Sequence, residues 1–406
     1  MGDILPFVLA VIFVAINGLT QLAFAQGLGF RLKPTGLAFM VAAGLGLAFR
    51  SFSPVSGQSA MIALAGRNED ERERVAALLI AAVVSTILGL AGAISTVVDF
   101  AGVAVMGGMM AGVGIMLAQI GTDFITDKKK GNFWVGMVSL VSALLIFGFF
   151  NMQTGIRPSP NVLVYTVAGS VGISTAFYLI MKKIRGESLA VENTDNQNVR
   201  PESNDPKFWT ANYWKNGDWK LVSPRFTIKS ILSAFALICL GIGVVTSFGV
   251  INAQMATRAT GIEHIQNFDH LILITGLVDF VGVIFGGMPL EPIISATAET
   301  SWPVLGAFAL MLVLGALALL GLVTKICKYM PVQSIAGFLV VIGFFETFLP
   351  NIVHGFRVGP RAANFHDNIA ESAVAMGVTA LTKNPFLGIV AGVLVRFIGT
   401  FFGFVA

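Results

Sequence analysis

Long apolar stretches recur from one end of this 406-residue chain to the other, and they limit the folds open to it. Most are close to the ~20 residues that an α-helix needs to cross ~30 Å of hydrocarbon. The chain is 55% hydrophobic and only 12% charged, about half the charged share of a soluble globular domain. The sequence therefore predicts an all-α polytopic membrane protein.

About fourteen apolar segments can be distinguished by their length and the polar residues between them. They lie near 4–25, 34–49, 52–66, 75–98, 102–122, 132–150 and 159–181, and near 229–250, 267–286, 289–301, 303–327, 331–349, 369–382 and 386–405. Residues 183–227 between these two groups are polar and rich in Asn, Asp and Glu, which is typical of a solvated linker. We therefore predict a first seven-span repeat at 1–182, a polar linker at 183–227 and a second repeat at 228–406.

Two segments differ from the others because they are short and contain proline and hydroxyl residues. They are span 3 (52–66, FSPVSGQSAMIALAG) and span 10 (289–301, PLEPIISATAETS), each the third segment of its half. Residues 97–116 also align with 326–345 without a gap. An odd number of spans per repeat requires the second copy to be inverted. Interrupted segments at matching places are typical of a transporter's binding site, so we predict that spans 3 and 10 are broken and meet in mid-membrane.

Several stretches resemble the nucleobase/ascorbate transporters, a family that includes bacterial uracil and xanthine permeases. In chain order they are LKPTGLAFMVAAGLGLAFRSFSPVSGQSAMIAL (32–64), WKLVSPRF (219–226), VINAQMATRATG (250–261) and YMPVQSIAGF (329–338). The resemblance implies a seven-plus-seven inverted repeat. It also implies a core domain of about 1–98 plus 228–328 and a gate domain of about 101–182 plus 330–406.

In that family an extended piece and a half-helix of spans 3 and 10 face the substrate, which the helix N-termini help to bind. Carried over by position, one side of the site consists of Gly57, Gln58, Ser59, Ala60 and Met61. The other side consists of Pro289, Leu290, Glu291, Pro292, Ile293, Ile294 and Ser295. The chain departs from the family in span 8, where CLGIGVVTSFG (239–249) has no acidic residue. A second family glutamate, in span 10, falls near Ser295.

Three carboxylates are candidates for binding a coupling ion, because a charge inside a membrane costs at least ~2.5 kcal/mol and is usually functional. Glu291 lies between two prolines, which prevent regular helix; the alternative is an ordinary loop residue. Asp279 is embedded in span 9, where the alternative is a carboxylate that bonds a Thr or Ser of a neighbouring helix. Glu299 faces either water or the gate.

These features predict a secondary active transporter of a small polar, nucleobase-like solute, coupled to H⁺ or Na⁺. No nucleotide-binding loop or hydrolase motif occurs in the sequence, so we predict neither an enzyme nor a cofactor. An anion carrier of the sulfate-permease type is the main alternative; a non-transporting membrane receptor and a membrane enzyme are weaker ones.

The remaining expectations concern partners and location. The net charge of +4 gives no reason to expect nucleic-acid binding. The resemblance implies a homodimer in the inner cell membrane with both termini in the cytoplasm. The lysines and arginines of the short loops favour the opposite orientation.

Overall fold

The computed structural model describes residues 4–66, 70–126, 132–154, 160–188, 219–327, 329–352 and 365–402, and most of these residues are helical. In the first half the helices are α1 (Ile4–Gly27), α2 (Leu32–Ala48), α3 (Ser59–Gly66), α4 (Glu71–Leu90), α5 (Ile94–Ala101), α6 (Val103–Thr126), α7 (Phe133–Thr154) and α8 (Pro160–Ile184). A two-residue strand, β1 (Val55–Ser56), precedes α3.

The second half contains α10 (Ile228–Thr260), α11 (Phe268–Val283), α12 (Pro303–Leu319), α13 (Leu322–Cys327), α14 (Ala336–Val341), α16 (Phe365–Thr382) and α17 (Pro385–Phe401). Strand β2 (Glu291–Pro292) and the 3₁₀ turn η3 (Ala296–Glu299) lie between α11 and α12. A 3₁₀ turn, η4 (Val332–Ile335), precedes α14, and a π-helical stretch, η5 (Ile342–Phe348), follows it.

The lengths of the apolar helices are those of an integral multi-pass membrane protein. Within the described residues, 7 helices of at least 18 residues are apolar enough to cross a membrane, and the shorter apolar helices have 10–17 residues. A short helix or an interrupted segment cannot be identified as a membrane span from its length alone. The predicted total of about fourteen spans therefore stays a prediction.

Glycine turns divide two segments that the sequence predicts to be single spans. Residues 75–98 are split because α4 ends at Leu90 and Gly92 turns with a φ of 64°. Residues 303–327 are split in the same way by Gly321, whose φ is 69°. Only glycine adopts this conformation without strain. The separate helices α5 and α13 follow these turns. Because the residues on both sides of each turn are apolar, the sequence pattern did not indicate the breaks.

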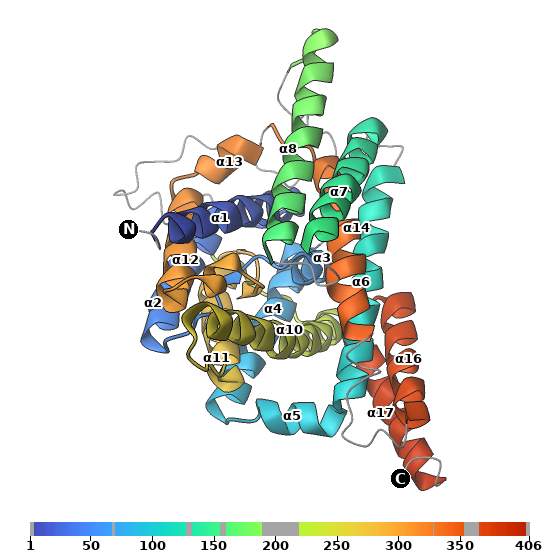
Figure 1. The fold of residues 1–406 in the computed structure, drawn as a ribbon. Coiled ribbons are helices and arrows are strands. Elements are labelled where there is room, and N and C mark those ends of the chain that lie inside the picture. Colours follow the sequence, from blue (N-terminus) through green and yellow to red (C-terminus); the bar gives the residue numbers. More distant parts are fainter. Residues whose placement is uncertain are drawn as a thin grey trace.

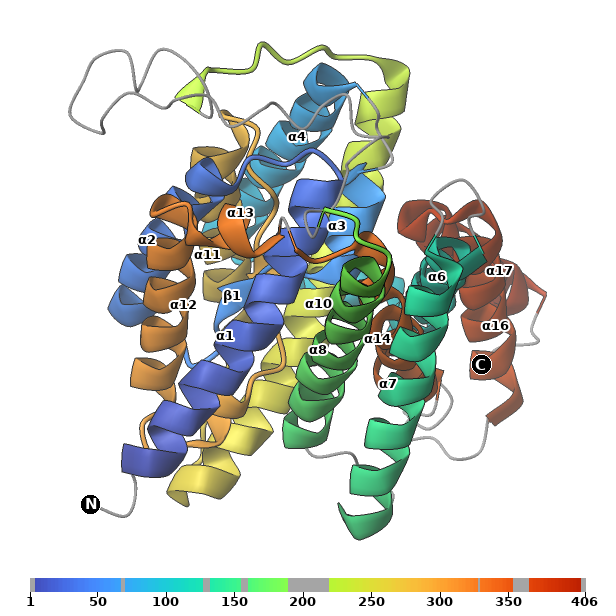
Figure 2. The same ribbon diagram turned by 90° about the horizontal axis from the view of Figure 1, so that it is seen from above.

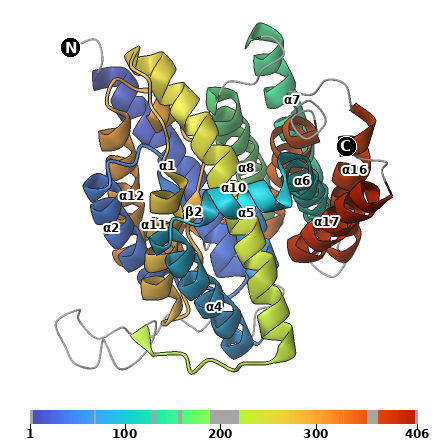
Figure 3. The ribbon, with the colours of Figure 1, turned by 90° about the horizontal axis from the view of Figure 1, so that it is seen from below.

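The helices form two groups that lie side by side (Figure 1). One group contains α1–α4 and α10–α12, in which α2 packs on α12 and α4 packs on α11. The other contains α6–α8, α14, α16 and α17, in which α6 packs on α16 and α7 packs on α14. The same grouping is visible from above and from below (Figures 2 and 3).

Strands β1 and β2 lie inside the first group, where β2 contacts both α10 and α11 (Figure 3). They pair antiparallel, with Val55 opposite Pro292 and Ser56 opposite Glu291. The spans predicted to be broken are thus interrupted, and their extended parts meet.

Small residues allow close contact within the second group. Gly114 of α6 and Gly343 of η5 face one another, and a Cβ added to Gly343 would lie 2.6 Å from the carbonyl oxygen of Gly114. These two glycines are aligned by the gapless match between residues 97–116 and 326–345. Any larger side chain at this crossing would push α6 and η5 apart.

Candidate functional site

The candidate site is centred on the β1–β2 pair. One further backbone bond extends the pair, because the Ile293 N–H donates to the Pro54 carbonyl at 3.1 Å. The two segments differ after their strands. The first continues into the eight-residue helix α3, whereas the second forms only the four-residue 3₁₀ turn η3.

The resemblance implies a half-helix in span 10, and here it is wrong. Ser295 accepts a hydrogen bond from the Thr297 N–H at 3.2 Å and so caps a short turn. Serine and threonine side chains compete in this way for the backbone bonds that a helix would use. Pro292 and the hydroxyl residues after it are therefore the physical reason for the difference.

The residues predicted on the first side of the site lie together, buried, at the start of α3. Gly57 is needed for close approach, since a Cβ there would lie 2.8 Å from Met288 Cε. The Gln58 side chain accepts from the Met61 N–H at 2.9 Å. Ser59 Oγ donates to Gln21 Oε1 of α1 at 2.7 Å. Ala60 and Met61 are buried beside them.

On the second side, Asp279 of α11 holds the residue that precedes β2. Its Oδ1 accepts the Leu290 N–H at 2.7 Å, and both residues are buried. The alternative prediction for Asp279 was a bond to a Thr or Ser hydroxyl of a neighbouring helix. In the structure its Oδ1 bonds the backbone N–H of Leu290 instead. The rest of the predicted second side is buried (Pro289, Leu290, Glu291, Pro292, Ser295) or half-buried (Ile293, Ile294).

Glu291 is the central side chain of this arrangement. It is 5% exposed, and its Oε2 has no hydrogen-bond partner among the described residues. Its Oε1 points at α10, where a Cβ on Gly241 would lie 3.1 Å away. Asp279 is close enough to interact with it electrostatically.

Ser56, directly opposite Glu291, is also buried, and its Oγ has no partner in the described part of the chain. Opposed residues of an antiparallel pair project from the same face of the sheet. A buried polar atom without a partner is costly, and an ion, a water molecule or a ligand would satisfy two such atoms on directly opposed residues.

Sequence reasoning did not identify three of the residues that shape this site. Ser56 carried no signal beyond its place before Gly57. Gly241 was noted only as part of a stretch without acids. Asn252 of α10, whose side chain bonds Ile293 and Ser295, was missed because span 8 was predicted to end near 250. Helix α10 continues to Thr260 and is capped by Gly261, whose φ is 70°.

Glu299 lies apart from the two buried carboxylates. It is exposed and lines a surface hollow of about 280 Å³ together with Pro6 and Arg258. It is the last residue of η3, whereas Glu291 lies in β2, which pairs with β1.

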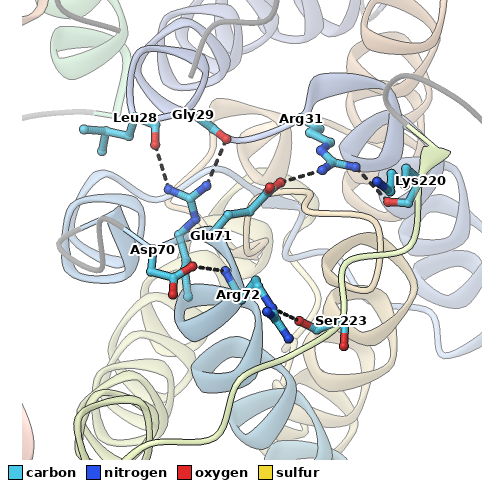
Figure 4. A network of polar contacts seen from close by, with 9 residues as sticks. Leu28, Gly29, Arg31, Asp70, Glu71, Arg72, Lys220 and Ser223 are labelled. Atoms are coloured by element: carbon cyan, nitrogen blue, oxygen red, sulfur yellow. Dashed lines mark hydrogen bonds and ion pairs between the residues drawn. The ribbon is translucent and has the colours of Figure 1, made fainter. Parts of the chain in front are cut away.

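A charged network fixes the turns beside the site (Figure 4). The Arg31–Glu71 ion pair measures 2.7 Å, and Arg31 also donates to the Lys220 carbonyl. Arg74, buried on α4, donates to the carbonyls of Leu28 and Gly29. The Arg31 N–H bonds the Gly286 carbonyl at 2.9 Å, which connects the network to the turn before β2.

The end of the predicted linker belongs to this network. Arg72 donates to the Ser223 carbonyl at 3.0 Å (Figure 4). Trp219 is buried, with its ring 5.7 Å from that of Phe285. The rest of the linker, 189–218, lies outside the described residues.

Comparisons with known proteins identify the family and the fold of the chain. The model of the Permease family, named for xanthine and uracil permeases, matches residues 10–302. Among solved structures, the transmembrane domain of a cyanobacterium bicarbonate transporter is 16% identical, with a TM-score of 0.55 over 97% of both chains. A murine solute carrier 26 family anion transporter, member A9, is 13% identical, with a TM-score of 0.62 over 99% of this chain and 69% of that one. No curated protein sequence matches significantly. At these identities the solved structures share the fold alone.

Proposed function

Because the chain belongs to the permease family, we propose that it is a secondary active transporter whose solute binds beside the β1–β2 pair, at the side chains of Ser56 and Glu291. The family and the fold make it a membrane transporter rather than an enzyme. The observation that carries the proposed site is the pair of buried, unpartnered polar atoms, Ser56 Oγ and Glu291 Oε2, on directly opposed residues.

The chemistry of this pair favours a small polar solute such as a nucleobase. A carboxylate accepts hydrogen bonds, and a serine hydroxyl can donate one. A solute with an N–H beside a carbonyl would satisfy Glu291 and Ser56 together. Gly241 supports this proposal, because its missing side chain leaves room at the carboxyl group.

We propose Glu291 as the primary coupling residue and Asp279 as its neighbour in the same buried cluster. A buried carboxylate without a donor is unfavourable unless it binds a proton or a cation. Entry of H⁺ or Na⁺ would therefore prepare Glu291 for the solute. Glu299 has no part in this proposal, because it is exposed.

The helix packing supports an inverted repeat with a core group and a gate group. If the two halves are repeats of one another, α2 corresponds to α11 and α4 corresponds to α12. The contact between α2 and α12 then has its counterpart in the contact between α11 and α4. In the same way, α6 corresponds to α14 and α16 corresponds to α7, so the contact between α6 and α16 has its counterpart in the contact between α14 and α7. Movement of one group past the other would expose the site alternately to the two sides of the membrane.

An anion carrier is the second candidate function, because the two solved transporters of this fold are described as carriers of bicarbonate and of anions. The positive end of the α3 helix dipole, at its N-terminus, favours an anion. The Glu291 carboxylate opposes one, and for this reason we rank the polar solute first. A homodimer in the inner membrane with cytoplasmic termini remains a proposal from family resemblance.

Uptake by the purified protein in proteoliposomes tests the function. Radiolabelled uracil, xanthine, sulfate and bicarbonate are offered under an imposed proton or sodium gradient. Accumulation of uracil or xanthine supports the proposal, and accumulation of sulfate or bicarbonate alone supports the anion carrier. No accumulation of any of the four, in vesicles that contain folded protein, counts against both.

A further inference from the structure

Asn252 of α10 contacts both interrupted segments through one side chain. The residue is fully buried. Its Nδ2 donates to the Ile293 carbonyl at 2.8 Å and to Ser53 Oγ at 3.2 Å, and its Oδ1 accepts the Ser295 N–H at 3.1 Å. Both amide hydrogens and the oxygen are therefore engaged. Only one orientation of the amide satisfies a backbone carbonyl and a backbone N–H together.

The bonds of Asn252 continue into a chain that reaches α11. Ser53 Oγ donates to Gln266 Oε1 at 3.0 Å, and Gln266 Nε2 donates to the Asn267 carbonyl at 3.2 Å. Asn267 in turn caps the start of α11. Hydrogen bonds in such chains polarise and strengthen one another inside a protein. Span 3, α10 and the start of α11 are thus connected by side chains.

A corresponding contact occurs in the first half. Gln21 of α1 accepts the hydroxyl of Ser59, the third residue after β1. Asn252 of α10 accepts the N–H of Ser295, the third residue after β2. Each half thus uses a carboxamide of its first long helix to hold the serine that follows its strand. Asn252 differs because it also bonds the backbone carbonyl of Ile293 and reaches Ser53 of the other half.

We infer that Asn252 is the positioning residue that keeps β2, and with it the Glu291 carboxyl group, in register with β1. Strands of two residues do not hold their register unaided. Asp279 holds β2 on one side through Leu290, and Asn252 holds it on the other through Ile293 and Ser295. The inference rests on the proposed transport function for its kinetic test.

The kinetic test compares Asn252→Asp and Asn252→Ala with the control Thr246→Val. Asn252→Asp has nearly the same shape and keeps an acceptor for Ser295, but it cannot donate to Ile293 or Ser53. Thr246 lies on the same helix, and its hydroxyl bonds only the carbonyls of Ile242 and Gly243 in its own helix. Uptake is measured for whichever of uracil, xanthine, sulfate and bicarbonate the wild type accumulates.

Both Asn252 variants are expected to raise KM by about tenfold or more while the maximal rate per folded protein changes little. The control is expected to keep the wild-type KM. An unchanged KM in Asn252→Ala overturns the inference. A lower maximal rate with an unchanged KM also overturns it, since a general loss of active protein gives that result.

Hydrogen exchange of the peptide 289–297 in nanodiscs provides a second readout that needs no solute. Faster exchange in Asn252→Asp by about tenfold, with wild-type exchange in Thr246→Val, supports the inference. Equal exchange in all three proteins overturns it. If the wild type transports none of the four solutes, the proposed function fails, and the exchange experiment still decides the role of Asn252.

Discussion

Substitutions of Asp279 can show whether its side chain acts by holding β2 in place or by carrying a charge. Its Oδ1 accepts the buried Leu290 N–H at 2.7 Å. Removing this acceptor leaves the buried N–H unsatisfied, which costs about 1–3 kcal/mol. Asp279→Ala should therefore reduce the population with β2 held in place by roughly fivefold to 150-fold, because about 1.4 kcal/mol corresponds to a factor of ten.

Asp279→Asn is the matched variant, because it keeps an acceptor oxygen and removes only the charge. We expect Asp279→Ala to raise the KM of solute uptake by at least about fivefold and Asp279→Asn to stay near the wild-type KM. Uptake into proteoliposomes at a constant ion gradient measures both, with thermal unfolding as the control for folded protein. A wild-type KM in Asp279→Ala refutes the reasoning. Equal losses in the two variants show that the charge matters and the acceptor does not.

Two glycines provide further predictions. Gly241→Val places methyl groups against Glu291 Oε1, which is 3.1 Å from the position of a Cβ. Solute uptake should therefore fall while the protein still folds. Unchanged uptake kinetics would mean that the solute does not use the space beside Gly241. Gly114→Val forces a side chain into the backbone of Gly343. Overpacking of this kind costs about 1–3 kcal/mol, so the melting temperature should fall, and a melting temperature equal to the wild type would contradict the close contact of α6 and η5.

The apolar runs and the interruptions in spans 3 and 10 were sufficient to predict the class of the protein and the meeting of the two segments. Proline, glycine and hydroxyl residues in a membrane span leave backbone groups that need partners. These residue types can be read directly from the sequence. The pairing of Ser56 with Glu291 was not predictable, because register depends on contacts between residues far apart in the chain.

The limits of the helices were harder to predict where polar residues lie inside them. Span 8 was predicted to end near 250, before Asn252, yet α10 continues to Thr260. Its bonds to Ile293 and Ser295 compensate for its polarity inside the helix. The packing of Trp219 on Phe285 was not predictable either, because it joins residues far apart in the chain.

Glu291 and Asp279 were identified from the cost of a carboxylate in a membrane, and the structure brings them together. Glu299 was selected by the same argument but lies at the surface. Glu291 lies in β2, which pairs with β1, whereas Glu299 is the last residue of the turn η3. Hydropathy alone therefore cannot distinguish a buried carboxylate from one at the end of a turn.

The most direct test of the account is ion-driven accumulation by Glu291→Gln, compared with Glu299→Gln as the control. Glutamine keeps the shape of the buried side chain and removes its charge, so we expect normal expression and folding, loss of accumulation against a gradient, and retention of solute exchange. Glu299→Gln, at an exposed carboxylate, should accumulate solute as the wild type does. Accumulation by Glu291→Gln at the wild-type level, with unchanged dependence on pH and sodium, would contradict the account.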